Sequence, residues 1–325
     1  MQRYIAKRAL LAIPTVLGVV VIVFFLVRLA PTDVADRLTG DSLAAGDQEV
    51  LQQIREDLGL EGSTSDQLTR YLLSLARGDF GTSYYSGQPV IRDIVERLPV
   101  SVQLGTMSIA LALLIGLPVG TVAALKQDTA IDYLLRGGVV LFLAMPAFWM
   151  AILILMFGAN QFGLDLGFKW SPPGRYYDLW DRPYENLLIM ILPSAILAVH
   201  IGAIYARYLR TTLLEVFRED YVRTARGKGL SESSVILRHA FPNALIPVVT
   251  VIGLSLPIAI TGAVILERIF GIPGLGRYFI ENASRADYPA IQALTILVAV
   301  FVVTVNLVVD LSYAVLDPRI RETSR

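Results

Sequence analysis

The sequence predicts an all-α protein that crosses a membrane six times. Of its 325 residues, 54% are hydrophobic and 17% are charged, and the mean hydropathy of +0.58 is too high for a soluble domain. The apolar residues gather into six runs, each about long enough to cross a hydrocarbon core of roughly 30 Å at about 1.5 Å per helical residue. We therefore expect helices within the bilayer and polar segments outside it.

The first apolar run extends from Ile5 to Ala30 and begins among three basic residues, Arg3, Lys7 and Arg8. A basic start is also typical of a cleaved signal peptide. This run is too long for a signal peptide and has no small-x-small cleavage site before Pro31. Residues 1–30 are therefore expected to be an uncleaved transmembrane helix.

Residues 31–99 are predicted to be a soluble extracytoplasmic insertion. They contain no membrane-length apolar run and carry twelve acidic residues against six arginines. Helices are expected around Gln48 to Leu58 and Gln67 to Ala76. The insertion either faces a soluble partner or packs as a lid on the outer rim, and we favour the lid for most of its residues.

Five further runs form a predicted helical core over residues 100–318, followed by a cytoplasmic tail, 319–325. The runs are Val100–Leu125, Tyr133–Gly158, Asn186–Tyr205, Leu245–Leu266 and Ile291–Leu316. With the N-terminus inside, fifteen basic residues share its side, against six in the two shorter outer loops. Long translocated segments are largely exempt from this count, so both termini are expected to be cytoplasmic.

Prolines interrupt several runs, at Pro118, Pro146, Pro193 and Pro257. A proline frees a backbone carbonyl and kinks the helix, which serves either to line a pathway or to aid packing. Our pathway candidates are Pro146, Phe148, Trp149 and His200. His200 is a candidate because it is polar and intramembrane, with a structural, hydrogen-bonded histidine as the alternative. Asp310 is expected to pair with Arg207 or Arg210 as part of the architecture.

The segment 207–244 is too polar to lie in a bilayer, with seven basic and four acidic residues. Its apolar positions Leu214, Phe217, Tyr221 and Ala225 are spaced as one helix face, and Gly227 and Gly229 break that helix. Ser231 is the expected N-cap of a second short helix, which Pro242 closes. The pattern predicts two short amphipathic helices that dock a partner, or else an ordinary basic loop.

The spacing within this loop resembles a signature segment of ABC-importer permeases. Arg223-Thr224-Ala225, three residues, Gly229, nine residues and His239-Ala240-Phe241-Pro242 follow the family pattern. The usual motif has Glu, Ile and Leu where this chain has Arg223, His239 and Phe241. A basic residue and a histidine there are normal in the dipeptide/oligopeptide/nickel branch, so the chain is similar to the first permease subunit of that branch.

The resemblance covers essentially the whole chain and is loosest in residues 31–77. The N-terminus, Gly78 to Ser83, Arg97-Leu98-Pro99 and Ala144 to Trp149 are each similar to family segments. The resemblance implies a type I ABC-importer-like fold in the cytoplasmic membrane of a prokaryote. It also implies that the chain forms half of a translocation pathway for di- or oligopeptides, with nickel, glutathione or oligosaccharides as alternative substrates.

The resemblance further implies which partners the chain has. These are a second permease subunit in a heterodimer, two ATP-binding subunits, an extracytoplasmic substrate-binding protein and the membrane lipid. ATP and Mg belong to the partner subunits, and no cofactor is expected in this chain. The expected ATPase-coupling residues are Arg223, Thr224, Ala225, Arg226, Lys228, Gly229, Leu230, Ser231, His239 and Pro242.

The outer loop from Glu267 to Gly276 resembles the family's Glu-x-x-Phe-x-x-Pro-Gly-Leu-Gly segment. Its glycines open no βαβ unit, so they are not a nucleotide fingerprint. The loop is expected to shape an outer gate, with ordinary tight-turn chemistry as the competing account. The gate candidates are Glu267, Phe270, Pro273, Gly274 and Gly276.

The sequence gives no sign of an enzyme. It has no G-x-x-x-x-G-K-[ST] segment, no cysteine and two distant histidines, so neither a phosphate-binding loop nor a Cys or His metal site is expected. The net charge is zero, and we expect no nucleic-acid partner. A stand-alone secondary transporter would show inverted repeats or charges near the midplane, and neither is evident. A membrane scaffold without transport is the third possibility.

Overall fold

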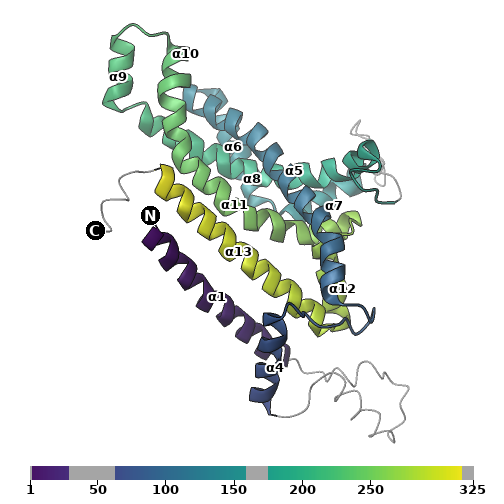
Figure 1. Cartoon of the computed structure of the whole chain (residues 1–325). Helices are drawn as coiled ribbons and strands as arrows, with labels where there is room; N and C mark the ends of the chain where they lie inside the picture. Colours follow the sequence, from purple (N-terminus) through teal and green to yellow (C-terminus); the bar gives the residue numbers. More distant parts are fainter. Residues whose placement is uncertain (1, 29–62, 159–174, 317–325) are drawn as a thin grey trace, which may run out of the picture. The chain divides into compact units, whose positions relative to one another are not determined.

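The structure is a computed structural model, and it describes residues 2–28, 63–158 and 175–316 (Figure 1). Helices account for the regular structure of these residues, apart from one isolated bridge between Thr82 and Pro89. The chain divides into two compact units, the first of residues 97–277 with 304 onward and the second of residues 2–96 with 278–303. The predicted helix at residues 48–58 and the predicted tail at residues 319–325 lie outside the described ranges.

Among the described residues, four helices are long and apolar enough to cross a membrane, or up to five spans if a bent pair of shorter helices counts as one, whereas the sequence predicted six. They are α5 (Val90–Leu125), α8 (Pro183–Val216), α11 (Phe241–Phe270) and α13 (Tyr288–Leu316). Helix α1 (Gln2–Arg28) contains a shorter apolar stretch, Leu10–Leu26. Helix α5 begins at Val90, inside the predicted insertion, and therefore continues beyond the apolar run that predicted it.

The third predicted span is not one helix. It consists of α6 (Ala130–Ala144) and α7 (Ala147–Gly158), which meet at an angle of 98°. Pro146 lies in the break, where it supplies no N–H for the carbonyl of Phe142 four residues earlier. The predicted interruption at Pro146 is therefore confirmed, as a break between two helices.

Helices α5 and α8 cross at very close range because small residues face one another. A Cβ atom added at Gly116 would lie 2.5 Å from the carbonyl oxygen of Gly202, and one at Gly120 would lie 2.6 Å from that of Ala206. Such small-xxx-small pairs let two backbones approach inside a bilayer. Since lipid tails are as apolar as leucine, close packing rather than transfer from water stabilises this crossing.

The first unit is packed in three tiers along α8. Ile189 and Met190 lie in the first tier, Ile201 and Tyr205 in the middle one, and Leu209 and Leu213 in the third. The third tier also contains Ala240, Ala244 and Val248, which precede or open α11. The third tier therefore ties the polar loop that follows α8 to the spans.

The second unit contains α1, the described residues of the insertion up to Glu96, α12 (Leu275–Arg285) from Tyr278 onward, and α13 up to Val303. The predicted helix at residues 67–76 is confirmed as α4 (Thr64–Ala76), with Ser63 as its N-cap. Tyr71 of α4 packs on Phe24 of α1 with ring centroids 5.6 Å apart. Further along, Ser83 donates a 2.5 Å hydrogen bond to buried Asp287.

Candidate functional site

The polar loop folds as two short helices joined at Gly229. Helix α9 spans Asp220–Gly227, and α10 spans Glu232–Ser234. Gly229 has φ of +77°, and its N–H donates to the carbonyl of Arg226 at 2.9 Å. The left-handed backbone that ends α9 is the conformation glycine favours. The predicted break at the glycines is confirmed, and Ser231 is the N-cap residue of α10, although its side chain makes no cap hydrogen bond.

The two helices are held together by a small core and one ion pair. Val222, Ala225 and Val235 are buried against each other. Arg226 donates from Nε and NH2 to the two oxygens of Glu232, at 3.2 and 2.7 Å. The hydrogen bond to Glu232 raises the pKa of Arg226 above its usual range. The two short helices are therefore held rigidly against each other, even though most of their surface is exposed.

The predicted continuous helix face from Leu214 to Ala225 is wrong. Helix α8 ends at Val216, and turn bonds from Arg218 to Glu215 and from Glu219 to Val216 separate it from α9. The turn rotates the chain so that Val222 and Ala225 point inward, whereas Tyr221 is 42% exposed. The buried face of α9 thus differs from the face that the spacing indicated.

The prediction that Pro242 ends the second helix is also wrong. The π-helix η2 (Val235–Ala240) leads into α11 at Phe241, and the backbone stays helical at Ala240 and Phe241. Pro242 lies in the first turn of α11, where a missing N–H costs little. The wider π turn and this placement allow the chain to continue into the membrane helix. The helical backbone is therefore continuous from α10 through η2 into α11.

Several predicted coupling residues line one open hollow of about 370 Å³. Its lining consists of Tyr221, Thr224, Ala225, Lys228, Leu230 and His239. Five of these six were expected from the sequence, and Tyr221 was not. Burial, and then the nearby Glu219, raise the pKa of Tyr221. The hollow combines apolar walls with a cationic rim, which suits an apolar side chain of a partner next to an acidic group.

The remaining predicted coupling residues lie outside the hollow. Arg223 is exposed and makes a loose 3.5 Å contact with Asp220. Gly229, Ser231 and Pro242 are exposed, and Arg226 serves the internal ion pair. These residues therefore shape or flank the hollow rather than line it.

His200 binds the carbonyl that Pro146 leaves free. Its Nδ1 lies 3.2 Å from the carbonyl oxygen of Phe142, and since a carbonyl only accepts, Nδ1 carries the proton. The residue that would otherwise donate to Phe142 in a regular helix is Pro146. This contact matches the structural role weighed for His200. The other pathway candidates, Pro146, Phe148 and Trp149, are exposed on this chain.

Two of the predicted gate residues, Gly274 and Gly276, lie against the buried carboxylate of a third, Glu267. Helix α11 ends at Phe270, and Gly271 follows with a left-handed backbone. Glu267 Oε2 accepts from the backbone N–H of Gly276 at 2.7 Å and of Arg277 at 3.1 Å, and Oε1 accepts from Ser101 Oγ at 2.6 Å. Glu267 therefore caps the start of α12, as a side chain at the N-cap position usually does.

The glycines of this turn make room for that carboxylate and for the adjoining helix. A Cβ atom at Gly274 would overlap the Glu267 carboxylate, and one at Gly276 would overlap the backbone of Val264. Ser101 Oγ also accepts the N–H of Leu275 at 2.8 Å. Side chains thus satisfy the first three N–H groups of α12, and Ser101 is a member of this site that the sequence did not reveal.

A buried ion pair near the polar loop was also missed by the sequence analysis. Arg210 donates from Nε and NH2 to the two oxygens of Asp132, at 2.8 and 2.7 Å, and Asp132 is fully buried. Asp132 additionally accepts the N–H of Asp128 at 3.1 Å. The available signal was a lone aspartate in the first turn of an apolar run. The side chain of Asp310, the partner expected for Arg207 or Arg210, lies outside the described residues.

The apolar spans α5, α8, α11 and α13 are those of a multi-pass membrane protein. The chain belongs to the family described as binding-protein-dependent transport system inner membrane component, which matches residues 116–322. The family's N-terminal region, the binding-protein-dependent transport system membrane component N-terminus, matches residues 1–105. The chain is therefore a permease subunit with the type I ABC-importer fold, as the resemblance implied.

Relatives match the chain over nearly its whole length. It is 37% identical to the oligopeptide transport system permease protein AppB of Bacillus subtilis over 98% of this chain and 99% of the relative. It is 36% identical to the dipeptide transport system permease protein DppB of Haemophilus influenzae over 99% and 100%. It is 38% identical to the glutathione transport system permease protein GsiC of Pectobacterium atrosepticum over 99% of each.

Proposed function

We propose that this chain forms half of a pathway that imports short peptides across the cytoplasmic membrane of a prokaryote. The support is the set of relatives named for oligopeptide, dipeptide and glutathione transport, which match at 36–38% identity over essentially the full length. Glutathione is itself a short peptide, so one substrate class accommodates all three names. In this proposal a second, related permease supplies the other half, and an extracytoplasmic binding protein delivers the substrate.

The observation that carries the mechanism is the braced hairpin of α9, α10 and η2. A part that transmits force from a partner must be rigid, exposed and continuous with the spans. The Arg226–Glu232 ion pair supports the rigidity of the hairpin. The hollow around Tyr221 and Lys228 provides an exposed surface, and the helical path from η2 into α11 makes the hairpin continuous with a span.

In the proposed cycle, two ATP-binding subunits dock on the hairpins of the two permeases. Their closure on ATP pushes on the helix pair around Gly229, and α8 and α11 rock from an inward-open to an outward-open arrangement. Hydrolysis reverses the motion and releases the substrate inward. ATP and Mg are bound by the partner subunits, and this chain performs no chemistry.

The proposed orientation places both termini and the hairpin in the cytoplasm. The support is the excess of basic residues on that side, fifteen against six in the shorter outer loops. The turn around Glu267 then lies outside the cell. There it would anchor the outer gate through the hydrogen bonds between Glu267 and the start of α12.

The test is Gly229→Glu in the assembled importer, reconstituted in vesicles with its binding protein. A Cβ atom at Gly229 meets nothing within 4 Å, so the change creates no clash. It does add a charge at the junction and forces a side chain into a left-handed backbone, at a cost of roughly 1–2 kcal/mol. We expect ATP-dependent peptide uptake to fall at least about tenfold, the effect of roughly 1.4 kcal/mol in the docking equilibrium, while membrane insertion is unchanged.

Gly229→Asn is the matched control, because asparagine tolerates the left-handed backbone and brings no charge. It is expected to keep most of the uptake. Normal uptake by the Gly229→Glu importer would contradict the coupling role of the hairpin.

A further inference from the structure

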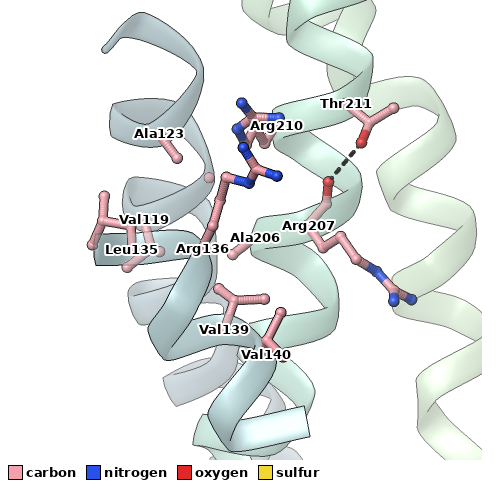
Figure 2. A pocket seen from close by; sticks show the side chains of 11 residues that line it. Val119, Ala123, Leu135, Arg136, Val139, Val140, Ala206, Arg207, Arg210 and Thr211 are labelled. Atoms are coloured by element: carbon pink, nitrogen blue, oxygen red, sulfur yellow. Dashed lines mark hydrogen bonds between the residues drawn. The ribbon is translucent and has the colours of Figure 1, made fainter. Parts of the chain in front are cut away.

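A cavity of about 270 Å³ lies between α5, α6 and α8 (Figure 2), toward the C-terminal ends of α5 and α8 and the middle of α6. Its walls are mostly apolar, formed by Val119, Ala123, Leu135, Val139, Val140 and Ala206. Three arginines, Arg136, Arg207 and Arg210, complete the lining together with Gly120 and Thr211. Figure 2 shows Arg136 extending from α6 toward the Arg210 side and Arg207 pointing away from the walls. None of these features is used by the proposed transport cycle.

The arginines carry more positive charge than nearby carboxylates neutralise. Arg210 is committed to Asp132 through two hydrogen bonds. Arg136 and Arg207 lie over the rings of Tyr133 and Tyr208, at 5.7 and 5.6 Å, and neither has a carboxylate partner among the residues that the structure describes. Two nearby carboxylates, those of Asp128 and Asp132, offset two of the three arginines, so one positive charge remains in excess.

The surface beside the cavity is strongly apolar. Leu134 and Val140 of α6 are 76% and 65% exposed, and Val122 of α5 is 41% exposed. In a membrane protein, exposed side chains of this kind contact lipid tails or another subunit. An apolar cavity with cationic residues at helix ends has the polarity of a phospholipid, with a phosphate near the membrane surface and an acyl chain below it.

We propose that this cavity binds one anionic phospholipid. The guanidinium group of Arg136 holds the phosphate, since arginine bonds phosphate oxygens through paired N–H groups. Arg207 lines the cavity but points away from its walls (Figure 2), so it contributes positive charge near the site. One acyl chain lies along Val139, Val140 and Leu135. The Arg210–Asp132 pair fixes α6 against α8 and thereby sets the shape of the cavity. A soluble anion would gain nothing from the apolar wall, which is why we assign a lipid. The inference requires only that the chain lies in a membrane and is independent of the transported substrate.

The experiment measures lipid retained by the assembled importer. The importer is inserted in bilayers of equal amounts of phosphatidylglycerol and phosphatidylcholine, extracted in mild detergent and analysed by native mass spectrometry. We expect one phosphatidylglycerol retained per copy of this chain. In the Arg136→Gln, Arg207→Gln double variant, retention should fall roughly twentyfold, about fivefold for each basic residue lost near the surface.

Two further variants make the result decisive. Arg182→Gln removes an exposed arginine beside the other end of α8 and should leave retention unchanged. Val139→Trp fills the apolar wall without altering charge and should abolish retention, so it serves as the test if the double variant fails to assemble. Equal retention in the wild-type and cavity variants would overturn the proposal.

Two other occupants are distinguished by their own outcomes. Displacement of the bound phosphatidylglycerol by millimolar inorganic phosphate would show a simple anion site and overturn the lipid assignment.

The chain contains no cysteine, so a single Val140→Cys change allows specific cross-linking. Efficient cross-linking of that position to the second permease would show that a subunit covers the cavity, and would overturn the proposal as well.

Discussion

At the scale of single residues, Gly274 is the position where the outer turn is most sensitive. Its missing side chain provides the space that the Glu267 carboxylate occupies. We predict that Gly274→Ala displaces this carboxylate and leaves the N–H groups of Gly276 and Arg277 without their acceptor. Each buried group left unsatisfied costs about 1–3 kcal/mol. A clear drop in the thermal unfolding midpoint of the purified importer would be the expected result.

Gly137→Ala is the control for that measurement, since Gly137 is helical and an added Cβ atom meets nothing within 4 Å. Alanine in a helix is favoured over glycine by roughly 0.8–1.0 kcal/mol, so this variant should unfold at or above the wild-type temperature. If both variants unfolded alike, the capping role of Glu267 would be excluded.

At the scale of elements, the crossing of α5 and α8 depends on backbone contact that only small residues permit. We predict that Gly120→Ala separates the two helices, because the new Cβ atom would lie 2.6 Å from the carbonyl oxygen of Ala206. Overpacking of a tight contact costs about 1–3 kcal/mol. The measurement is again thermal unfolding of the purified importer.

The control lies on the same helix at Gly105, where an added Cβ atom would be 3.8 Å from Ile260, an ordinary contact. Gly105→Ala should therefore be neutral or slightly stabilising. Equal effects of the two changes would mean that the close approach at Gly120 does not stabilise the crossing.

At the scale of the whole molecule, hydropathy predicted the existence of the spans but not their exact form. Apolar composition identifies a span and Pro146 indicates a kink, whereas neither predicts the 98° angle or that His200 on α8 binds the freed Phe142 carbonyl. The glycine break at Gly229 was predicted because left-handed backbone is a local property. Asp132 and Ser101 were missed because their roles come from partners distant in sequence, Arg210 and Glu267.

The last prediction concerns the composition of the assembly. The hairpin exposes a hollow with Lys228 in its lining, which suits the docking of another subunit. We predict that the chain, purified from native membranes in mild detergent, carries with it a second permease and two ATP-binding subunits, identified by mass spectrometry. Charge reversal at Lys228, by Lys228→Glu, should weaken retention of the ATP-binding subunits without losing the second permease, because our proposal assigns the hairpin to the ATP-binding subunits alone. Recovery of the chain alone, or as a homodimer without an ATPase, would instead favour a stand-alone transporter.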